Sequence, residues 1–453
     1  MTVVDTCLDV RNDPSEEDDG VVRTGTTSTC VSHIITSVIG SGILSLAWST
    51  AQLGWIGGPV CMILLAIVTY VSVFLLSNVY RTPDSIHGGR NKSYIEAVKN
   101  SLGTNQTWVC GLLQYVNLYG TGVAYTITAS ISLRAIQRVN CYHQKGSEAP
   151  CEYSDNTNMY LFGIVQIFCC FIPDFNNLAW LSGVAALMSF CYSSIAIALG
   201  FAKTIGDGQI KGNMIGIPAP SSIQRIWNIS QAVGDIAFAY PYSLLLLEIQ
   251  DTLKSPPAEK KTMRKASIIS IPITTVFYLL CSCFGYAAFG NDTPGNLLTG
   301  FGFYEPFWLI DFANACVILH LIGGYQIYSQ PIFAFADTWF AEKYPNTDFV
   351  NTVYPIPMPF SAKPYNLILS RLTFRTIYVV TTTIIAILFP YFNQVLGILG
   401  ALNFWPLTVY FPVEMYILQN RISTWSRKWV LLQTFSAVCF MSVCLLWLDR
   451  WKV

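Results

Sequence analysis

The sequence predicts an all-α polytopic membrane protein of about eleven transmembrane helices. Its 453 residues are 53% hydrophobic and only 11% charged, with a mean hydropathy of +0.45. Soluble domains carry about 25% charged residues, so this composition lies well outside their range. Apolar runs of about 20 residues, the length that spans a bilayer core, recur along the chain, whereas the short alternating segments of an outer-membrane barrel do not occur.

Composition and motifs also argue against several other classes of protein. Lys plus Arg and Asp plus Glu total 26 each, so the sequence offers no basic surface for nucleic acid. No Cys-x-x-Cys pair is present and most cysteines lie in apolar runs, so we expect no metal site. The sequence lacks His-Glu-x-x-His, Gly-x-Ser-x-Gly and a phosphate-binding glycine loop, so we do not expect an enzyme.

Eleven apolar stretches are the expected membrane spans. In chain order they are 30–50, 56–79, 107–135, 159–173, 177–201, 226–249, 267–289, 305–336, 372–390, 394–418 and 429–449.

The charged loops predict how these spans are oriented. Lys and Arg concentrate in the loops 81–99, 254–265 and 421–428, which an eleven-span chain places on one side together with the N-terminus. The positive-inside rule makes that side cytoplasmic and puts the C-terminus outside the cell. The opposite loop 290–303 has no Lys or Arg. Residues 1–25 are acidic and lack the apolar core of a signal peptide, so we expect a cytoplasmic tail there.

Cys141 and Cys151 differ from the other cysteines because they lie in a polar loop, 138–158, on the expected extracellular side. Two nearby cysteines in an oxidising compartment favour a disulfide. Two free thiols are the alternative.

The hydropathy has a coarse internal symmetry. The first five spans and the next five form blocks of similar length, and each block has an odd number of spans. The two blocks would therefore insert with opposite orientations, which is the arrangement of inverted-repeat transporters. The expected divisions are the tail (1–25), a first five-helix repeat (26–201), an extracellular connection (202–223), a second five-helix repeat (224–418), and a cytoplasmic loop with the eleventh helix (419–453).

Two spans at matching positions in these blocks carry helix-breaking residues. The first contains Gly40-Ser41-Gly42, and glycine costs a helix interior about 1 kcal/mol relative to alanine. The sixth contains Pro241, which removes a backbone donor and clashes with the preceding turn. Unwound backbone is tolerated in a membrane only where it is buried in protein or lines a watery cavity, and paired interruptions indicate a substrate site. Two ordinary kinks are the alternative.

The two breaks would offer complementary groups to a ligand. Unwinding at Gly40–Gly42 frees N–H groups and the positive end of a half-helix, which attract an anion. Unwinding at Phe238–Pro241 frees carbonyl oxygens, which suit a cation. Donors on one side and acceptors on the other fit a zwitterion such as an α-amino acid. The residues expected to bind it at the breaks are Ile39, Gly40, Ser41, Gly42, Phe238, Ala239 and Tyr240.

Four stretches of the sequence resemble the plant amino acid permeases of the amino acid/auxin permease superfamily. They are HIITSVIGSGILSLAWSTAQLGW, AFAYPYSLLLLEIQDTLKSPPAEKKTMRKAS, NLLTGFGFYEPFWLIDFANACVILHLIGGYQIYSQP and LGILGALNFWPLTVYFPVEMYI. The resemblance implies proton-coupled uptake of amino acids at the plasma membrane. It also implies a leucine-transporter-like fold of five plus five inverted helices, with helices 1 and 6 broken. The chain departs from the family at Thr27–Cys30, where a tryptophan is usual, and at Pro241, where relatives often have Ser or Ala.

The third span supplies two further candidates for the substrate site. Tyr119 and Tyr125 flank a glycine-rich turn (Gly120 and Gly122) at mid-membrane. Aromatic residues of this helix wall the substrate site in the similar fold, although a tyrosine that faces lipid is the alternative.

The eighth span contains Asp311, Asn314 and His320. Asp311 and Asn314 lie one turn apart and share a helix face, whereas His320 lies on the opposite face at about 100° per residue. We therefore expect Asn314 to bind substrate, Asp311 to have a functional role and His320 to have only a packing role.

Ionisable residues inside spans are candidates for carrying the coupling proton, because their burial is costly. His33 shares a face with Gly40 and is of the residue type that titrates near neutral pH. A hydrogen bond to a neighbouring helix is the alternative role for His33. Asp235 lies just before the second break, where it could instead cap the half-helix. Asp311 and Glu414 complete the set.

Together these features predict a proton-coupled amino acid symporter that works by alternating access. A proton and an amino acid would bind from outside, the bundle would rock, and both would leave to the cytoplasm. We expect import of neutral amino acids, with acidic and basic ones as further candidates, and no cofactor other than the proton. The lipid bilayer is the remaining partner. The alternatives are an amino acid sensor without transport, and an auxin carrier or sodium-coupled relative.

Overall fold

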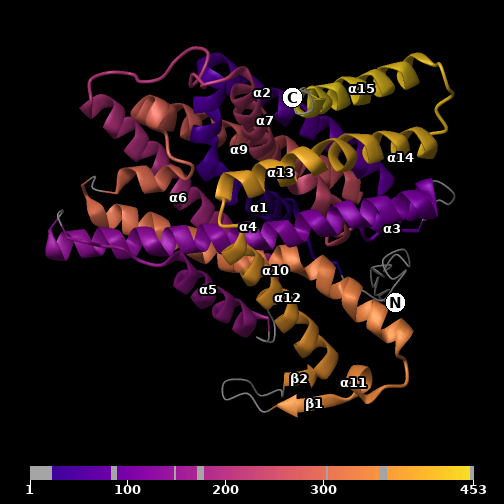
Figure 1. Cartoon of the computed structure of the whole chain (residues 1–453). Helices are drawn as coiled ribbons and strands as arrows, with labels where there is room; N and C mark the ends of the chain where they lie inside the picture. Colours follow the sequence, from indigo (N-terminus) through magenta and orange to yellow (C-terminus); the bar gives the residue numbers. More distant parts are fainter. Residues whose placement is uncertain are drawn as a thin grey trace, which may run out of the picture.

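The computed structural model describes most of the chain, and helices form nearly all of this part (Figure 1). The described residues are 23–82, 89–146, 149–170, 178–302, 305–356 and 365–448. Within them the sheet is a single two-stranded antiparallel ladder. Residues 1–22 of the expected tail, the ends of the expected spans at 173 and 449, and the C-terminus lie outside the described residues.

The elements follow the expected order of spans. The first half contains α1 (Thr27–Val38), η2 (Ser41–Ser45), α2 (Leu46–Val79), α3 (Tyr94–Leu102), α4 (Thr104–Lys145), α5 (Asp155–Cys169) and α6 (Leu178–Gly206). The second half contains α7 (Ser222–Phe238), η3 (Pro241–Leu245), α8 (Leu246–Asp251), α9 (Glu259–Phe289), η4 (Gly290–Asp292), η5 (Leu297–Phe301), α10 (Phe307–Lys343), α11 (Asp348–Asn351), β1 (Val353–Ile356), β2 (Tyr365–Ile368), α12 (Leu369–Leu388), α13 (Phe392–Asn403), η6 (Phe404–Tyr410), α14 (Phe411–Gln419) and α15 (Arg427–Leu448). The segments η2 to η5 are 3₁₀-helices, and η6 is a π-helix.

The first span is broken where the sequence predicts. The helix α1 begins with a capping box at Thr26 and ends at Val38. Ile39 and Gly40 leave the helical conformation, and Gly40 has φ −110° and ψ −149°. The chain resumes as the 3₁₀-helix η2 and continues into α2. This first span ends at Gly54, whose φ of +80° favours glycine and turns the chain into the second span.

The sixth span repeats this order of elements. The helix α7 ends at Phe238, Ala239 and Tyr240 follow, and the chain resumes as the 3₁₀-helix η3 before α8. Pro241 opens η3, a position at which a helix needs no N–H donor. Both breaks thus consist of two residues followed by a 3₁₀-helix and a short α-helical segment. This correspondence confirms that helices 1 and 6 are both broken, at matching positions.

Seven helical stretches of the described chain are each long and apolar enough to cross a membrane. The other expected spans also fall on helices. The first expected span is divided among α1, η2 and the start of α2, and α1 has only 12 residues. The helix α4 has 42 residues but carries many polar ones, and α5 and α15 have 15 and 22 residues and border on residues outside the described part.

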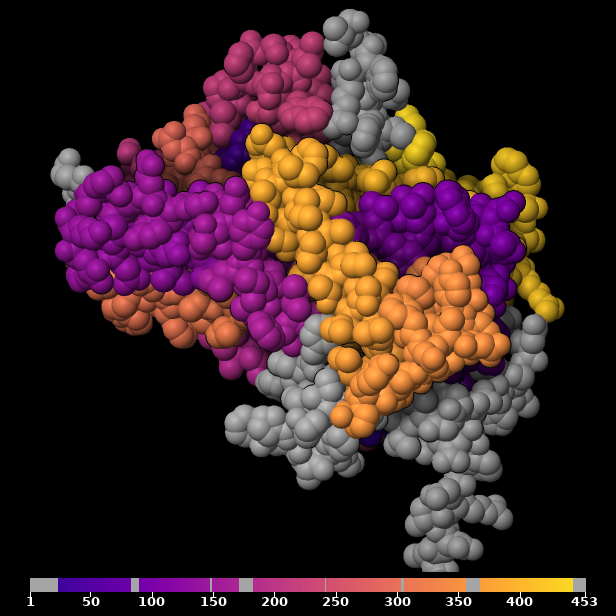
Figure 2. Space-filling model, turned by 60° about the horizontal axis from the view of Figure 1, so that its bottom comes forward, coloured from indigo at the N-terminus to yellow at the C-terminus, as the bar shows by residue number. Residues whose placement is uncertain are grey.

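The two broken helices lie at the centre of the bundle. The helix α7 packs against α2 and α13, α9 packs against α1 and α2, and α10 packs against α4 and α6. Figure 1 shows α4 running the length of the bundle, with α15 at the edge beside α14. In Figure 2 the yellow-orange residues of α12 and α13 form a band, and purple residues of α3, α4 and α5 emerge on either side. The inner end of the bundle is here the end that holds Arg23 and Asp251, and the outer end is the one that holds Cys141 and Cys151.

Candidate functional site

The two helix breaks lie directly against each other. A Cβ atom on Gly42 would lie only 3.2 Å from Cα of Ala239, so the absence of a side chain at Gly42 permits this approach. The Tyr278 hydroxyl of α9 donates to the Ala239 carbonyl oxygen at 2.7 Å and also lies against the Val38 carbonyl oxygen. Tyr278 therefore joins the end of α1 to the end of α7.

The first break presents hydrogen-bond donors without partners. Ser41 and Gly42 open the 3₁₀-helix η2, and the first N–H groups of a helix have no partner within it. Ser41 is only 1% exposed, and its Oγ has no hydrogen-bond partner among the described residues. Buried polar groups are nearly always hydrogen-bonded in native proteins, so an unpartnered hydroxyl at a helix break suits a ligand.

The carbonyl groups at the breaks are largely occupied. The Tyr192 hydroxyl lies 3.1 Å from the Ile39 carbonyl oxygen and 3.0 Å from that of Gly40, and the Ser189 hydroxyl lies 2.8 Å from that of Ile39. The Ala239 carbonyl oxygen, which we expected to be free for a cation, accepts from Tyr278. The donor side of the expected zwitterion site is thus better defined than its acceptor side.

Of the two tyrosines expected at the site, Tyr125 lies at the first break. Its hydroxyl oxygen would be 2.9 Å from a Cβ atom on Gly40. Tyr119 instead packs edge-on against Tyr378, at 5.4 Å between ring centroids, and lines a groove between α4, α12 and α13.

The expected glycine-rich turn between these tyrosines is absent, because α4 is continuous through it. A Cβ atom on Gly120 would lie 2.4 Å from Cδ2 of Leu399, and one on Gly122 would lie 3.1 Å from the Tyr378 hydroxyl. These glycines therefore permit close packing of helices rather than a turn.

His320, which we expected to serve packing, lies beside the first break. Its Nδ1 is 2.9 Å from the Ser189 hydroxyl and 3.1 Å from the Ala185 carbonyl oxygen. Its Nε2 is buried without a partner and would be 3.7 Å from a Cβ atom on Gly40. Helical periodicity gave the relative faces in α10 but not which face turns toward the breaks. In the sequence, the available sign of a close approach on this face was Gly324, four residues after His320. In the structure, a Cβ atom on Gly324 would lie 2.8 Å from the Tyr125 ring.

The contacts of Asp311 and Asn314 lie on α4 and α10 rather than at the breaks. Asp311 accepts a hydrogen bond from Asn140 Nδ2 at 2.7 Å, near the outer ends of α10 and α4. Asn314 is fully buried, and its Nδ2 donates to the Ile310 carbonyl oxygen at 2.9 Å. Among the described residues, no hydrogen bond joins either side chain to the two breaks.

The proton candidates on the broken helices occupy different ends of the bundle. His33 of α1 lies on the inner side of the first break, with its Nδ1 2.7 Å from the Ser182 hydroxyl. Asp235 of α7 lies on the outer side of the second break and is completely buried. Its carboxylate accepts from Asn393 Nδ2 at 3.2 Å and Gln231 Nε2 at 3.5 Å, so its partners there are neutral amides.

Glu414, also a proton candidate, faces the eleventh helix. Its Oε1 accepts a hydrogen bond from Gln433 Nε2 of α15 at 2.7 Å. This contact joins α14 to α15 and does not involve the breaks.

A cavity of about 620 Å³ lies between the breaks and the inner end. His33, Gln114, Leu245 and Glu248 contribute to its lining. Glu248 Oε1 accepts from the Tyr94 backbone N–H at 3.2 Å, and its Oε2 is buried without a partner among the described residues. The cavity thus leads from the second break past His33 and Glu248, and the ionisable side chains of Lys92, Glu96 and Lys99 line it as well.

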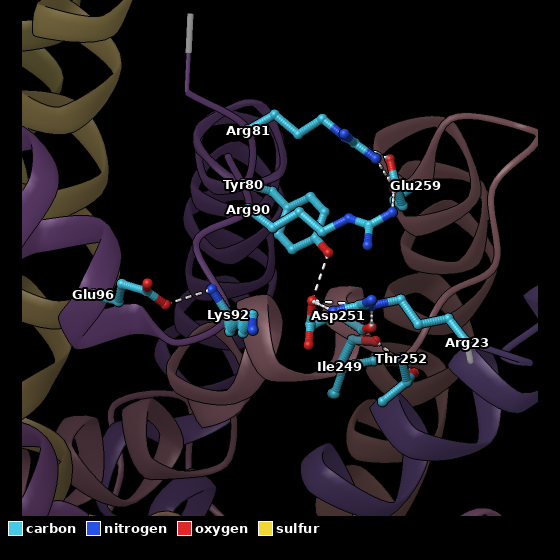
Figure 3. A network of polar contacts seen from close by, with 10 residues as sticks. All are labelled: Arg23, Tyr80, Arg81, Arg90, Lys92, Glu96, Ile249, Asp251, Thr252 and Glu259. Carbon is cyan, nitrogen blue, oxygen red and sulfur yellow. Dashed lines mark hydrogen bonds and ion pairs between the residues drawn. The ribbon is translucent and has the colours of Figure 1, made fainter. Parts of the chain in front are cut away.

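A polar network closes the inner end around Asp251, the last residue of α8 (Figure 3). Arg23 pairs with the Asp251 carboxylate at 2.9 Å, and the Tyr80 hydroxyl donates to it at 2.7 Å. The Gly25 N–H donates to the Thr252 carbonyl oxygen at 2.9 Å. Burial, followed by the hydrogen bond to Asp251, raises the pKa of Tyr80, so Tyr80 stays a donor. The segment before α1 is thereby attached to the end of α8.

Two arginines extend this network to the start of α9. The Glu259 carboxylate pairs with Arg81 and lies 3.7 Å from Arg90. The hydrogen bond to Glu259 raises the pKa of Arg81. These contacts connect the chain after α2 with α9.

Cys141 and Cys151 are joined by a disulfide at the outer end, with 5.9 Å between their Cα atoms. The bond attaches the end of α4 to the chain that leads into α5.

Comparisons with known proteins identify the family of the chain. Residues 23–448 match the family described as transmembrane amino acid transporter protein. The chain is 56% identical to probable amino acid permease 7 of Arabidopsis thaliana over 433 residues, which covers 95% of this chain and 92% of that protein. It is 54% identical to amino acid permease 2 of Arabidopsis thaliana, covering 94% of this chain and 87% of that protein.

A solved structure shares the fold at low sequence identity. The crystal structure of MhsT in complex with L-phenylalanine superposes with a TM-score of 0.58, at 12% identity, and covers 95% of this chain and 100% of that one. Together with the matched family and the relatives, this places the chain in the plant amino acid permease family, with a leucine-transporter-like fold.

Proposed function

We propose that this protein is a proton-coupled symporter that imports amino acids, neutral ones first, across the plasma membrane by alternating access. The observation that carries the proposal is the contact between two matching helix breaks, with the unpartnered hydroxyl of Ser41 at the first. Backbone N–H groups at a helix start favour a carboxylate. The relatives named as amino acid permeases support the same class of substrate.

Two buried groups support proton coupling. Asp235 is fully buried and its hydrogen-bond partners are uncharged side chains, and a carboxylate held in a membrane protein without a cation is costly unless it binds a proton. His33 lines the inner cavity, where a proton could leave. We assign proton binding to these two residues, one on each side of the breaks.

The energetics of one proton per amino acid are sufficient for accumulation. Moving one charge through 100 mV releases about 2.3 kcal/mol. One pH unit adds about 1.4 kcal/mol. Together these two contributions could sustain a ratio of internal to external amino acid concentration of roughly several hundred.

Purified protein in liposomes tests the proposal. An imposed pH gradient, acidic outside, should drive concentrative uptake of a labelled neutral amino acid, and a proton ionophore should abolish it. Uptake that depends on sodium and not on the pH gradient would contradict proton coupling. Saturable binding without any uptake or exchange would instead indicate a sensor.

A further inference from the structure

A second cavity, of about 530 Å³, lies at the outer end between α4, η5 and the start of α13. Sites for small molecules occupy about 300–1,000 Å³, so this volume could hold an amino acid. The cavity is separate from the inner one and shares no lining residue with it.

The charged lining of the outer cavity consists of Arg134 and Arg138, one turn apart on α4, and no described Asp or Glu lines it. Arg134 pairs with Asp155, which offsets its charge. Arg138 is exposed and has no carboxylate partner among the described residues; its Nη2 donates to the Tyr142 hydroxyl at 3.2 Å. The cavity therefore carries an uncompensated positive charge.

An unpartnered donor lies in the same cavity. Asn296, just before η5, is only 4% exposed, and its Oδ1 accepts from the Leu298 N–H at 3.1 Å. Its Nδ2 is buried without a hydrogen-bond partner among the described residues. Leaving a buried donor unpaired costs about 1–3 kcal/mol, and a bound acceptor would remove this cost.

The cavity adjoins the outer half of the second broken helix. Asn393 lines it and donates through Nδ2 to the Asp235 carboxylate of α7 at 3.2 Å. A ligand held in the cavity would thus be one side chain away from a buried group of the broken helix.

We propose that the outer cavity is a binding subsite for the carboxylate of an amino acid on its way to the helix breaks. The Arg138 guanidinium and the Asn296 amide donate to the carboxylate oxygens, and a guanidinium matches a carboxylate with two parallel hydrogen bonds. The absence of an acidic residue from the described lining means that the ammonium group is not recognised there. That the ligand is an amino acid rests on the proposed function, whereas recognition of a carboxylate rests on the cavity alone.

A thiol reporter tests the subsite without relying on transport. Thr299 is exposed and lines the cavity, so Thr299→Cys places a small reactive group beside the two donors. The rate of its modification by an uncharged thiol reagent is measured in the full-length protein with added alanine, propionate or alaninol. We expect alanine to slow modification severalfold and alaninol, which lacks the carboxylate, to have no effect. Propionate should protect as alanine does, because only the carboxylate is recognised in the cavity, and protection by alanine without protection by propionate would contradict this.

Substitutions on α4 and α7 provide the matched comparison. Arg138→Gln should abolish protection and raise the KM for uptake severalfold with little change in the maximal rate, and Arg138→Lys should keep part of both. Arg225→Gln, which removes an exposed charge of α7 that does not line the cavity, should change neither.

Three results would overturn the subsite: equal protection by alanine and alaninol, no protection by any compound, or protection that survives Arg138→Gln. A protein that shows carboxylate protection but no uptake would refute the proposed transport and leave the subsite intact. The amount of folded protein, measured for each variant, separates loss of binding from loss of folding.

Discussion

Gly40 is closely surrounded by side chains of two other helices. A Cβ atom there would lie 2.9 Å from the Tyr125 hydroxyl and 3.7 Å from His320 Nε2. The absence of a side chain thus allows the first break to lie against α4 and α10 at the same point. The sequence alone indicated the conformational freedom of Gly40 but not this close approach.

Gly40→Ala should therefore impair transport while leaving the protein folded. Overpacking of this kind costs about 1–3 kcal/mol, which corresponds to roughly 5- to 150-fold in affinity. The measurement is the KM and maximal rate of amino acid uptake. Gly183→Ala is the control, because a Cβ atom at that position of α6 meets nothing within 4 Å. Similar kinetics for the two variants would show that the contact is not part of the site.

Ser41→Ala should weaken binding without lowering stability. The Ser41 hydroxyl has no partner among the described residues, so its removal breaks no hydrogen bond within them. A hydrogen bond to a ligand is worth about 0.5–1.5 kcal/mol, so KM should rise roughly two- to tenfold. Ser45→Ala is the comparison for stability. The Ser45 hydroxyl donates to the Gly42 carbonyl oxygen at 2.9 Å, so its removal does break an internal hydrogen bond. An unchanged KM with Ser41→Ala would remove Ser41 from the substrate site.

At the scale of elements, Gly54 sets the boundary between the first two spans. Its φ is +80°, and a Cβ atom would lie 2.3 Å from the Met214 carbonyl oxygen. The chain before α7 therefore packs directly onto the turn between the two halves of α2.

Gly54→Ala should lower stability more than Gly103→Ala does. Both glycines combine a positive φ with a ψ near 180°, a conformation that costs a residue other than glycine about 1–3 kcal/mol. Gly103 has φ +84° with nothing within 4 Å, so its substitution carries that cost alone. Gly54→Ala adds a clash with backbone that cannot rotate away. The thermal midpoint of unfolding is measured for both purified variants. Equal shifts would show that the chain around Met214 moves aside without loss of stability.

The segment before α1 is attached to the end of α8 through Asp251. Asp251→Asn weakens the ion pair with Arg23 and the hydrogen bond from Tyr80. Hydrogen bonds to charged groups contribute about 1.5–3 kcal/mol each at most, and the side chain of Asp251 is 22% exposed, so we expect a smaller loss. The result should be a lower thermal midpoint and faster proteolysis before α1.

Asp207→Asn is the control for this substitution. Lys211 donates to the Asp207 carboxylate at 2.7 Å and lowers its pKa, but the pair lies on the surface. Exposed pairs contribute little to stability. An equal loss in the two variants would mean that the inner network adds nothing beyond ordinary surface charge.

On the scale of the whole molecule, the breaks lie between two cavities. The inner cavity holds His33 and Glu248, whereas the outer one adjoins Asp235 through Asn393. Rocking of the bundle about the breaks would expose one cavity and then the other, which is how alternating access operates in inverted-repeat transporters.

Asp235→Asn should separate transport from proton coupling. The amide has nearly the shape of the protonated acid but cannot release a proton. Gln231 and Asn393 donate to different oxygens of the Asp235 carboxylate, so the single oxygen of the new amide keeps one of these two bonds. We expect exchange of internal for external amino acid to persist while accumulation driven by a pH gradient is lost. Accumulation at the normal level would exclude Asp235 from coupling, and loss of exchange together with accumulation would assign it a structural role.

The helix breaks could be predicted from the sequence, whereas the side chains around them could not. The breaks at Gly40 and before Pro241 were predictable because glycine and proline act on the backbone locally. Tyr125 and His320 are both buried in the middle of long helices, but only their packing against Gly40 reveals their position at the site. Tyr119 belongs to the same helix as Tyr125 and yet faces α12.

The sequence by itself determined the membrane class, the order of the spans and the two interrupted helices. Hydropathy and helix-breaking residues act within a single segment, so these features need no knowledge of neighbouring segments. Only the tertiary structure decided which side chains surround the breaks and which groups remain unpaired there. The rotation of a helix about its axis is set by contacts with elements hundreds of residues away. For that reason His320 lies beside the first break, whereas the contacts of Asp311, on the same helix, are at the outer end.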